Sequence, residues 1–372
     1  MYNKNILIGI YKTKKKKKKI EIEYIKELKY LLKIFNGRVV KVFLQKRFKQ
    51  NKLTFVGKGL IEKISLFIKK KKVDTVIFDE ELSLTQINNI EKKLKCIIAD
   101  RHKLILDIFS YRAKTSYSKI QVKLAQYKYL LPRLKHMWSH LKRQKGGIGM
   151  RGPGEKEIET DKRIIKKKIY TLTKKLDKIK KQIIIQRNNR ENFISISLVG
   201  YTNVGKTTII NNITKKKLLV ENKLFTTLDT NVNKFFFKNK KFLIIDTIGF
   251  LRKIPTNLIK SFKSSIIEIQ NSDIIIHVID VSSSYILDKF FFVNNYLLEL
   301  NVFKKKILII FNKIDKIKNF NKNYLKKIFY NNFLNNKYLK FKNYLIKFIC
   351  ISSKNKKNIF KLKEFIYNES LK

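Results

Sequence analysis

The sequence has few of the residues from which disulfides and zinc sites are built. It contains two cysteines and four histidines in 372 residues. Cys96 and Cys350 are far apart and lack the spacing of metal ligands, so we expect two thiols in a reducing compartment. His136 and His140 lie four residues apart, but the glutamate of an H-E-x-x-H motif is missing. The sequence therefore predicts neither a disulfide framework nor a zinc site.

Long hydrophobic runs are also missing. No stretch of roughly 18 apolar residues occurs, so no segment is expected to span a membrane. The apolar run at 5–11 is too short for a signal peptide, and the lysine run at 14–19 follows it instead of preceding it. We therefore expect a cytoplasmic protein.

Carboxylates are scarce relative to cations. The chain has 28 Asp and Glu against 85 Lys and Arg, a net charge of +57. Glycine and proline are scarce too, whereas Lys, Ile, Asn, Phe and Tyr, which have A/T-rich codons, are abundant. Genome bias and a polyanionic partner both stay open as the origin of the charge, which in either case favours contact with a phosphate backbone.

The length suffices for two or three domains, and residues 1–105 are expected to form a small α/β domain. Short apolar runs predict strands at 5–10, 37–43, 73–78 and 96–99, with helices expected at 20–34, 59–69 and 84–94. This alternation favours a parallel sheet. The turn Val56-Gly57-Lys58-Gly59 is typical of a helix start, with an anion site as the alternative.

Residues 106–190 are expected to form a long helical hairpin. The stretches 108–140 and 155–186 have apolar residues at helical spacing, and a basic, Gly-rich segment at 144–154 separates them. Four of the twelve glycines fall within 146–152. Close approach to an RNA backbone is the preferred interpretation of this tip, and a flexible linker is the alternative.

Residues 191–372 carry a phosphate-binding P-loop. The segment at 200–207 matches G-x-x-x-x-G-K-[ST] between a predicted strand at 193–199 and a predicted helix at 208–214. Its backbone N–H groups would cradle phosphate oxygens, Lys206 would reach the β- and γ-phosphates, and the Thr207 hydroxyl would ligate Mg²⁺. The predicted phosphate-binding residues are Gly200, Tyr201, Thr202, Asn203, Val204, Gly205, Lys206, Thr207 and Thr208.

Three further motifs follow strand-like runs, in the order of a guanine-nucleotide site. They are Asp246-Thr247-Ile248-Gly249, Asn312-Lys313-Ile314-Asp315 and Ser352-Ser353. Asp246 can hold Mg²⁺ through water, and the Gly249 N–H can sense the γ-phosphate. The Asp315 carboxylate can accept both N–H donors of the guanine edge, which adenine does not offer. Backbone N–H groups at 352–353 could meet the guanine O6.

Several stretches resemble the HflX family of ribosome-associated GTPases. The segments 146–155 and 159–163 resemble that family's signature loop, and segments between 107 and 133 resemble its helical region. Residues 225–229 and 246–252 resemble its switch I and switch II. The likeness covers nearly the whole chain. Lys156-Glu157-Ile158 departs from the family's usual Thr-Gln-Leu, and we expect no counterpart of the additional C-terminal domain of longer members.

The resemblance implies a P-loop GTPase domain preceded by a small α/β domain and a long helical hairpin. It implies GTP hydrolysis with Mg²⁺, and a monomer that binds the large ribosomal subunit (50S) and its rRNA and acts on stalled or idle ribosomes. Some members also bind ATP through the N-terminal domain. The implied switch I residues are Phe225, Thr226, Thr227, Leu228 and Asp229.

Within this scheme Thr227 completes the Mg²⁺ coordination, with Thr226 as the alternative. Asn203 resembles the asparagine of potassium-stimulated GTPases, which implies K⁺. The expected catalytic set is Lys206, Thr227, Asp246, Gly249 and Asn203. Phe250 stands where many GTPases place a water-orienting glutamine, so slow intrinsic hydrolysis is expected.

Two other functions remain open at this stage. A GTPase for ribosome assembly would show the same motifs. A non-catalytic RNA-binding scaffold with a vestigial nucleotide site is disfavoured because Lys206, Asp246 and Asp315 are all present.

Overall fold

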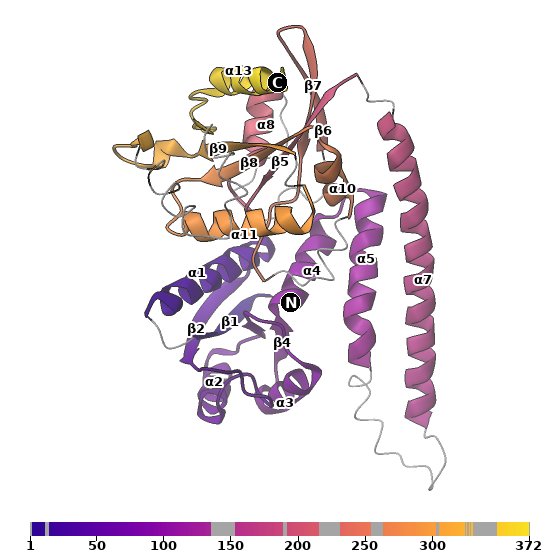
Figure 1. The fold of residues 1–372 in the computed structure, drawn as a ribbon. Helices are drawn as coiled ribbons and strands as arrows, with labels where there is room; N and C mark the ends of the chain where they lie inside the picture. The colour runs from indigo at the N-terminus through magenta and orange to yellow at the C-terminus, as the bar shows by residue number, and fades with distance from the viewer. Residues whose placement is uncertain are drawn as a thin grey trace. The chain divides into compact units, whose positions relative to one another are not determined.

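The chain forms two compact units, of residues 1–178 with 253–261 and of residues 179–252 with 262–372. The computed structural model describes residues 2–11, 15–134, 153–188, 192–215, 231–253, 263–302, 305–323, 325, 327, 329 and 348–371. Figure 1 shows the elements of both units along the chain. The division into domains at 1–105, 106–190 and 191–372 stays a prediction.

The first unit contains the predicted parallel sheet. Its strands are β1 (Lys4–Tyr11), β2 (Arg38–Lys46), β3 (Thr75–Phe78) and β4 (Ile97–Asp100), in the order β2-β1-β3-β4. The connecting helices are α1 (Lys15–Leu32), η1 (Lys33–Phe35), α2 (Lys58–Lys71) and α3 (Leu84–Leu94). Gly57 is the N-cap of α2, so the predicted turn does start a helix, and the Gly57 N–H donates to Gln45 Oε1 of β2 at 2.8 Å.

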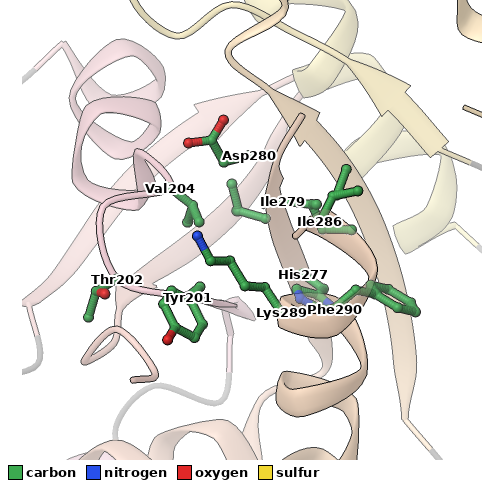
Figure 2. Close-up of a pocket in the computed structure, with 10 residues that line it drawn as sticks. Tyr201, Thr202, Val204, His277, Ile279, Asp280, Ile286, Lys289 and Phe290 are labelled. Carbon is green, nitrogen blue, oxygen red and sulfur yellow. The ribbon is translucent and has the colours of Figure 1, made fainter. Parts of the chain in front are cut away.

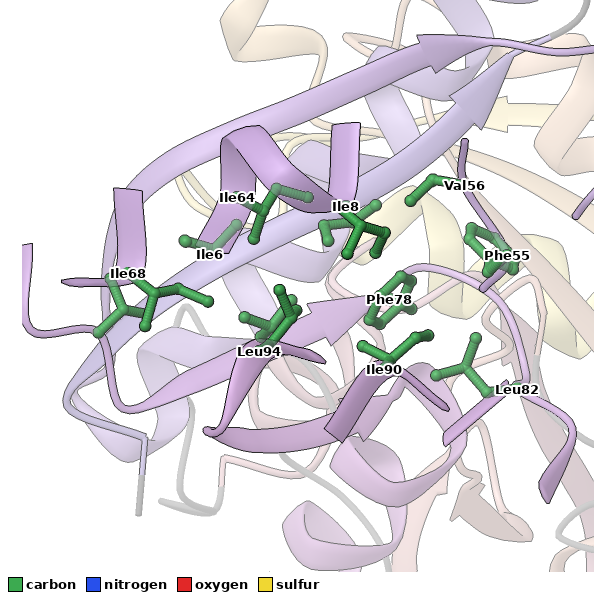
Figure 3. Packing of buried hydrophobic residues seen from close by; sticks show 13 residues of the cluster. Ile6, Ile8, Phe55, Val56, Ile64, Ile68, Phe78, Leu82, Ile90 and Leu94 are labelled. Atoms are coloured by element: carbon green, nitrogen blue, oxygen red, sulfur yellow. The ribbon is translucent and has the colours of Figure 1, made fainter. Parts of the chain in front are cut away.

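Alternation along the strands places apolar side chains on both faces of this sheet. Ile6 and Ile8 of β1 and Phe78 of β3 face α2 and α3, whose Ile64 and Ile90 are fully buried against them (Figure 3). Leu7 points the other way and is equally buried. The central strands β1 and β3 are buried on both faces, which explains why they appear as short continuous apolar runs in the sequence.

The helical region differs in one respect from the expectation of a single helix at 108–140. The chain forms α4 (Arg101–Arg112), α5 (Ser116–Leu130) and η2 (Leu131–Arg133), so the expected helix is broken at 113–115. Thr115 Oγ1 accepts from Ser118 N at 3.1 Å and so caps a new helix. The reason is a local side-chain cap, which apolar periodicity does not reveal.

The second helix of the predicted hairpin is α7 (Pro153–Asn188), which starts two residues before the expected Glu155. Proline suits the first position of a helix because its missing N–H would have had no partner there. Lys168 Nζ of α7 lies 5.6 Å from the Tyr127 ring of α5, so the two helices pack side by side (Figure 1). Residues 135–152, which include most of the predicted tip at 144–154, lie outside the described residues.

The second unit is a six-stranded sheet. Its strands are β5 (Ile194–Gly200), β6 (Asn231–Phe237), β7 (Lys240–Asp246), β8 (Ile274–Asp280), β9 (Lys306–Asn312) and β10 (Phe348–Cys350), in the order β10-β9-β8-β5-β7-β6. Among these strands only the edge strand β6 is antiparallel to its neighbour. The helices are α8 (Lys206–Thr214), α10 (Lys263–Asn271), α11 (Ile286–Glu299), η5 (Ile314–Lys316) and α13 (Ile359–Ser370).

This arrangement gathers the predicted motifs. β5, β7, β9 and β10 run parallel, so the loops that follow their carboxyl ends share one edge of the sheet. Within the described ranges, no helix combines the length and hydropathy needed to cross a bilayer.

Candidate functional site

The P-loop connects β5 to α8, as predicted. Gly205 has φ +99°, a left-handed conformation that favours glycine, and a side chain there would overlap the Asn312 amide. Lys206 is the first residue of α8, so the loop delivers its backbone N–H groups to a helix N-terminus. This is an anion-binding geometry, because those N–H groups have no helical carbonyl to bond.

Lys206 is buried beneath the loop. Its Nζ donates to the carbonyls of Gly200 at 3.3 Å and Tyr201 at 3.2 Å, and the residue is 7% exposed. Burial lowers the pKa of Lys206 to about 8, against the opposing attraction of Asp246. Carbonyls carry only partial charge, so an incoming phosphate would supply the full negative charge that this ammonium group favours.

The two residues predicted to organise Mg²⁺ are in contact. Thr207 Oγ1 donates to Asp246 Oδ2 at 2.7 Å, and Asp246 is fully buried as the last residue of β7. A hydroxyl and a carboxylate at the mouth of a phosphate loop fit Mg²⁺, which prefers oxygen ligands and keeps most of its waters. Within the described residues no cluster of three or more His, Cys, Asp or Glu side chains offers an alternative metal site.

The start of the predicted switch II is hydrogen-bonded to the P-loop through backbone groups. Phe250 N donates to Gly200 O at 3.0 Å, and Thr202 N donates to Phe250 O at 2.8 Å. A Cβ on Gly249 would come within 2.8 Å of Thr202 Cα, so only glycine permits this approach. The Phe250 ring packs 4.7 Å from that of Tyr296 and offers no polar group to the phosphate side.

Asn312 joins two loops of the site. Its Nδ2 donates to Val204 O at 2.8 Å and to Ser353 Oγ at 3.0 Å, while its Oδ1 accepts from Ser353 N at 2.9 Å. Asn312 is fully buried. These bonds hold the P-loop against the loop that follows β10, so the Asn of the N-K-x-D motif sets the shape of the site.

In the rest of that motif Ile314 is buried, Lys313 is partly exposed and Asp315 is exposed. Lys313 has φ +66°, and its Nζ donates to Asn203 O and pairs with Asp280 Oδ2 at 2.7 Å. Asp315 is exposed and accepts a hydrogen bond from Ser352 Oγ. An exposed carboxylate beside the loop at 352–353 is where the sequence predicts the guanine edge to bind.

The structure thus brings together most predicted residues and leaves one group untested. The P-loop, Asp246–Gly249, Asn312–Asp315 and Ser352–Ser353 meet at one sheet edge. The switch I residues, Thr226 and Thr227 among them, lie outside the described residues.

Two contributing residues were missed by the sequence analysis. Asp280 pairs with Lys313, and Asn212 Nδ2 donates to Ser353 O at 2.7 Å. Asp280 ends a buried strand as Asp246 does, which is a signal that could have identified it. Asn212 lies within α8 and has no such signal.

A small cavity lies behind the P-loop and is not the nucleotide site. It measures about 30 Å³, far less than a nucleotide needs, and Tyr201, His277 and Phe290 are among the residues that line it (Figure 2). His277 of β8 stacks on the Phe290 ring of α11 at 5.1 Å with an interplanar angle of 3°. Burial lowers the pKa of His277 to about 3, so this histidine is neutral at physiological pH.

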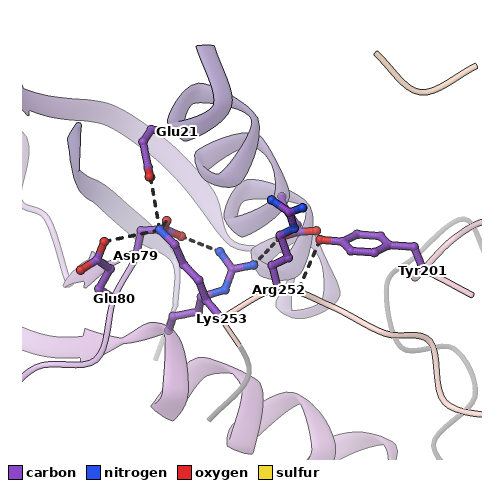
Figure 4. A network of polar contacts seen from close by, with 8 residues as sticks. Glu21, Asp79, Glu80, Tyr201, Arg252 and Lys253 are labelled. Carbon is purple, nitrogen blue, oxygen red and sulfur yellow. Dashed lines mark hydrogen bonds and ion pairs between the residues drawn. The ribbon is translucent and has the colours of Figure 1, made fainter. Parts of the chain in front are cut away.

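Arg252 belongs to the second unit and Lys253 to the first, and each makes polar contacts within its own unit (Figure 4). In the second unit, Arg252 N donates to the Tyr201 hydroxyl at 3.2 Å. In the first unit, Lys253 Nζ pairs with Asp79 at 2.7 Å and with Glu21 at 3.2 Å. Burial lowers the pKa of Lys253, but these carboxylates outweigh it and raise the pKa above the ordinary value.

Models of known families match three consecutive parts of the chain. Residues 22–110 match a GTP-binding GTPase N-terminal region, and residues 112–190 match a GTP-binding GTPase middle region. Residues 195–313 match a family described as 50S ribosome-binding GTPase.

Relatives match over most of the chain. A GTPase HflX of Flavobacterium psychrophilum is 49% identical over 317 residues, which are 85% of this chain and 76% of the relative. A GTPase HflX of Escherichia coli is 35% identical over 85% of this chain and 74% of its own length. A solved structure of a GTP-binding protein from Sulfolobus solfataricus in complex with GDP is 25% identical, covers 98% of both chains and has a TM-score of 0.51.

Proposed function

The chain belongs to the HflX family of GTPases and is a GTP hydrolase, and from this premise we propose that it acts on the large ribosomal subunit. In this proposal the protein binds stalled or idle ribosomes in the cytoplasm, as a monomer, and its nucleotide state decides whether the subunits stay joined. The observation that carries the proposal is the family model at 195–313, described as a 50S ribosome-binding GTPase.

The nucleotide site supports defined roles for its residues. Lys206 would bind the β- and γ-phosphates, and Asp315 would accept the two N–H donors of guanine. Thr207 and Asp246, which are already hydrogen-bonded to each other, would hold Mg²⁺, whose charge offsets that of the phosphates. Thr227 is the proposed switch I ligand, and a K⁺ ion beside Asn203 is the proposed source of further positive charge.

The helices of the hairpin support an RNA partner. α7 carries twelve Lys and Arg against five Asp and Glu, and most of its described side chains are exposed. Two of its isoleucines, Ile158 and Ile165, are buried, as expected of one apolar stripe on an otherwise solvated helix. A long basic helix presented to solvent would contact phosphate backbones and make binding dependent on salt.

The direct test is sedimentation of whole ribosomes with the purified protein. With a non-hydrolysable GTP analogue, we expect the 70S peak to decrease and free subunits to appear, and with GDP we expect no such change. A 70S peak that stays intact while the protein co-sediments with the large subunit would favour the rival function in ribosome assembly. A protein that binds neither ribosomes nor subunits would contradict both.

The predicted tip can be tested separately. Because α7 begins at Pro153, Gly154 lies in its first turn, and substitutions are better placed at Gly149 and Gly152. Replacing both by Val should weaken large-subunit binding but leave GDP affinity unchanged. Arg151→Ala should also weaken it, with a slope of log affinity against log salt shallower by about one unit or less. Variants that bind as the parent does at every salt concentration would mean that the segment is a linker.

A further inference from the structure

The second unit carries a cluster of partly exposed aromatic rings among lysines. The rings belong to Phe237 of β6 and to Phe360 and Tyr367 of α13, and the lysines are Lys238 and Lys240 of the β6–β7 hairpin. We call these five residues the aromatic–lysine patch. Figure 1 shows α13 beside the hairpin that joins β6 and β7.

The rings contact one another edge to face. Phe237 lies 5.7 Å from Phe360 and 6.0 Å from Tyr367, with interplanar angles of 70° and 71°. Phe360 nevertheless remains 64% exposed. A single exposed aromatic needs no explanation, but three clustered rings that leave one so exposed are typical of a binding surface.

The cations lie over the ring faces. Lys238 Nζ is 5.7 Å from the Phe237 centroid and 5.4 Å from that of Tyr367, and Lys240 Nζ is 5.8 Å from the latter. Among the described residues, the carboxylate paired with the patch is Glu364, whose Oε1 lies 3.8 Å from Lys238 Nζ. That distance and the exposure of both side chains make the pair weak, so it does not cancel the positive charge.

The surroundings add further positive charge. Lys215, at the end of α8, is close enough to Lys363 of α13 that, after burial, it is the next cause lowering the pKa of Lys363. Two ammonium groups in proximity create a potential that attracts a polyanion. A second copy of the chain is a poor occupant, because it would bring the same lysines against these.

Lysine alone would not single out this region, since lysines are abundant throughout the chain. The combination of ring faces and ammonium groups is more specific, because nucleobases stack on aromatic side chains while lysines bind the adjacent phosphates. We propose that the aromatic–lysine patch binds an RNA segment with unpaired bases. The bases stack on Phe360 and Tyr367, and Lys238 and Lys240 contact the phosphates.

This proposal goes beyond the function proposed above, since it adds an RNA contact separate from the P-loop and from the predicted hairpin tip. It also fixes the form of the RNA. A duplex hides its base faces inside the stack, so the patch discriminates against double-stranded RNA of equal charge.

A tryptophan reporter tests this proposal at the patch itself. The chain has one tryptophan, Trp138, so a Trp138→Phe, Phe360→Trp double variant fluoresces only at the patch. Titration with a single-stranded oligouridine should quench this fluorescence saturably, because a stacked base quenches indole. An RNA duplex with the same number of phosphates should quench it much less.

The matched control is Tyr30→Trp in the same Trp138→Phe background. Tyr30 is 54% exposed and has Lys33 Nζ 5.0 Å from its ring, but within the described part of the chain no second ring packs against it. Quenching there should be weak. Adding Tyr367→Leu to the Trp138→Phe, Phe360→Trp reporter should weaken oligouridine binding about tenfold, which is the effect of losing one stacked base. GDP binding to each variant serves as the check on folding.

Three results would overturn the proposal. The first is equal quenching by single-stranded and duplex RNA, which would indicate general charge attraction. The second is an affinity unaffected by Tyr367→Leu. The third is a protein dimer that Phe360→Asp dissociates, which would mean that the patch is an interface between two copies of the chain.

Discussion

Single residues of the nucleotide site serve different roles from those suggested by their motifs. Asn312 belongs to the base-recognition motif, yet its amide is fully used by Val204 and Ser353. Its loss would loosen the P-loop and the loop after β10 together. Lys313 likewise uses its ammonium group on Asn203 O and Asp280. Of the motif, Asp315 is therefore the residue that we propose to read the base.

The pKa of Lys206 predicts a proton linked to nucleotide binding. A free-site pKa of about 8 and a bound ammonium paired with phosphate imply uptake of about half a proton at pH 8 and almost none at pH 6.5. Affinity should therefore fall as pH rises above about 8. Isothermal titration of GDP in buffers of different ionisation enthalpy measures this uptake.

Guanosine is the control for that titration, since it lacks phosphate and should bind without proton uptake. The lowered pKa of Lys206 also predicts how the stability of the nucleotide-free protein changes with pH. Because the folded-state value of about 8 lies below the ordinary 10.5, the free energy of unfolding should rise with pH between those values. Absence of proton uptake at pH 8 would mean that Lys206 is already fully protonated in the free site, and it would contradict the lowered pKa.

Asp315→Asn should reverse the choice of base. The carboxylate accepts from two guanine donors, whereas an amide presents one acceptor and one donor, so the loss should be on the order of 2–4 kcal/mol in GTP binding. Xanthosine nucleotides should be favoured instead. Competition of GDP and XDP for the site measures the change. An unchanged preference for GDP would contradict the assignment of Asp315 as the base reader.

At the scale of elements, apolar runs predicted the strands well and the helix boundaries less well. Strands expected at 5–10 and 73–78 are observed as Lys4–Tyr11 and Thr75–Phe78, because a sheet buried on both faces needs continuous apolar runs. The break between α4 and α5 was missed because it depends on one hydroxyl, that of Thr115.

The candidate site was predictable to the extent that its chemistry lies in contiguous motifs. Each motif follows a strand, and parallel strands bring such loops to one edge. The cross-links between motifs were not predictable from one sequence. Asn212 and Asp280 contribute through contacts across 141 and 33 residues, respectively, and such pairings exist only in the folded chain.

Strand β8 should make the second unit sensitive to acid through His277. The pKa of His277 is about 3 in the folded state, below the ordinary 6.5. As pH falls through 6.5, the unfolded chain therefore binds more protons than the folded chain does. The second unit should lose about 2 kcal/mol of stability between pH 7.5 and pH 5 from this residue alone. Hydrogen exchange of the β5, β8 and β9 amides measures that loss.

His277→Gln is the matched variant for the acid effect. The glutamine amide can still bond Asn294 but does not titrate, so the variant should be less stable at neutral pH and show a flatter pH dependence. A pH dependence as steep as that of the parent would place the acid sensitivity elsewhere in the unit.

At the scale of the whole molecule, we expect the isolated protein to hydrolyse GTP slowly. Phe250 occupies the position where many GTPases orient water with glutamine. Its backbone is bonded to the P-loop, and its ring is packed on Tyr296. Reorienting this segment would break those contacts, so a bound partner is the natural source of the free energy required.

Basal GTP hydrolysis by the isolated protein should therefore be slow, and large ribosomal subunits should accelerate it. K⁺ in place of Na⁺ should accelerate it further if a cation binds beside Asn203. Phosphate release measured with and without subunits, in each salt at equal ionic strength, separates the two effects. The control is Lys206→Ala, which should abolish both the basal and the stimulated rates because it removes the phosphate ligand. A basal rate that is already fast and indifferent to subunits and to K⁺ would contradict the role assigned to Phe250.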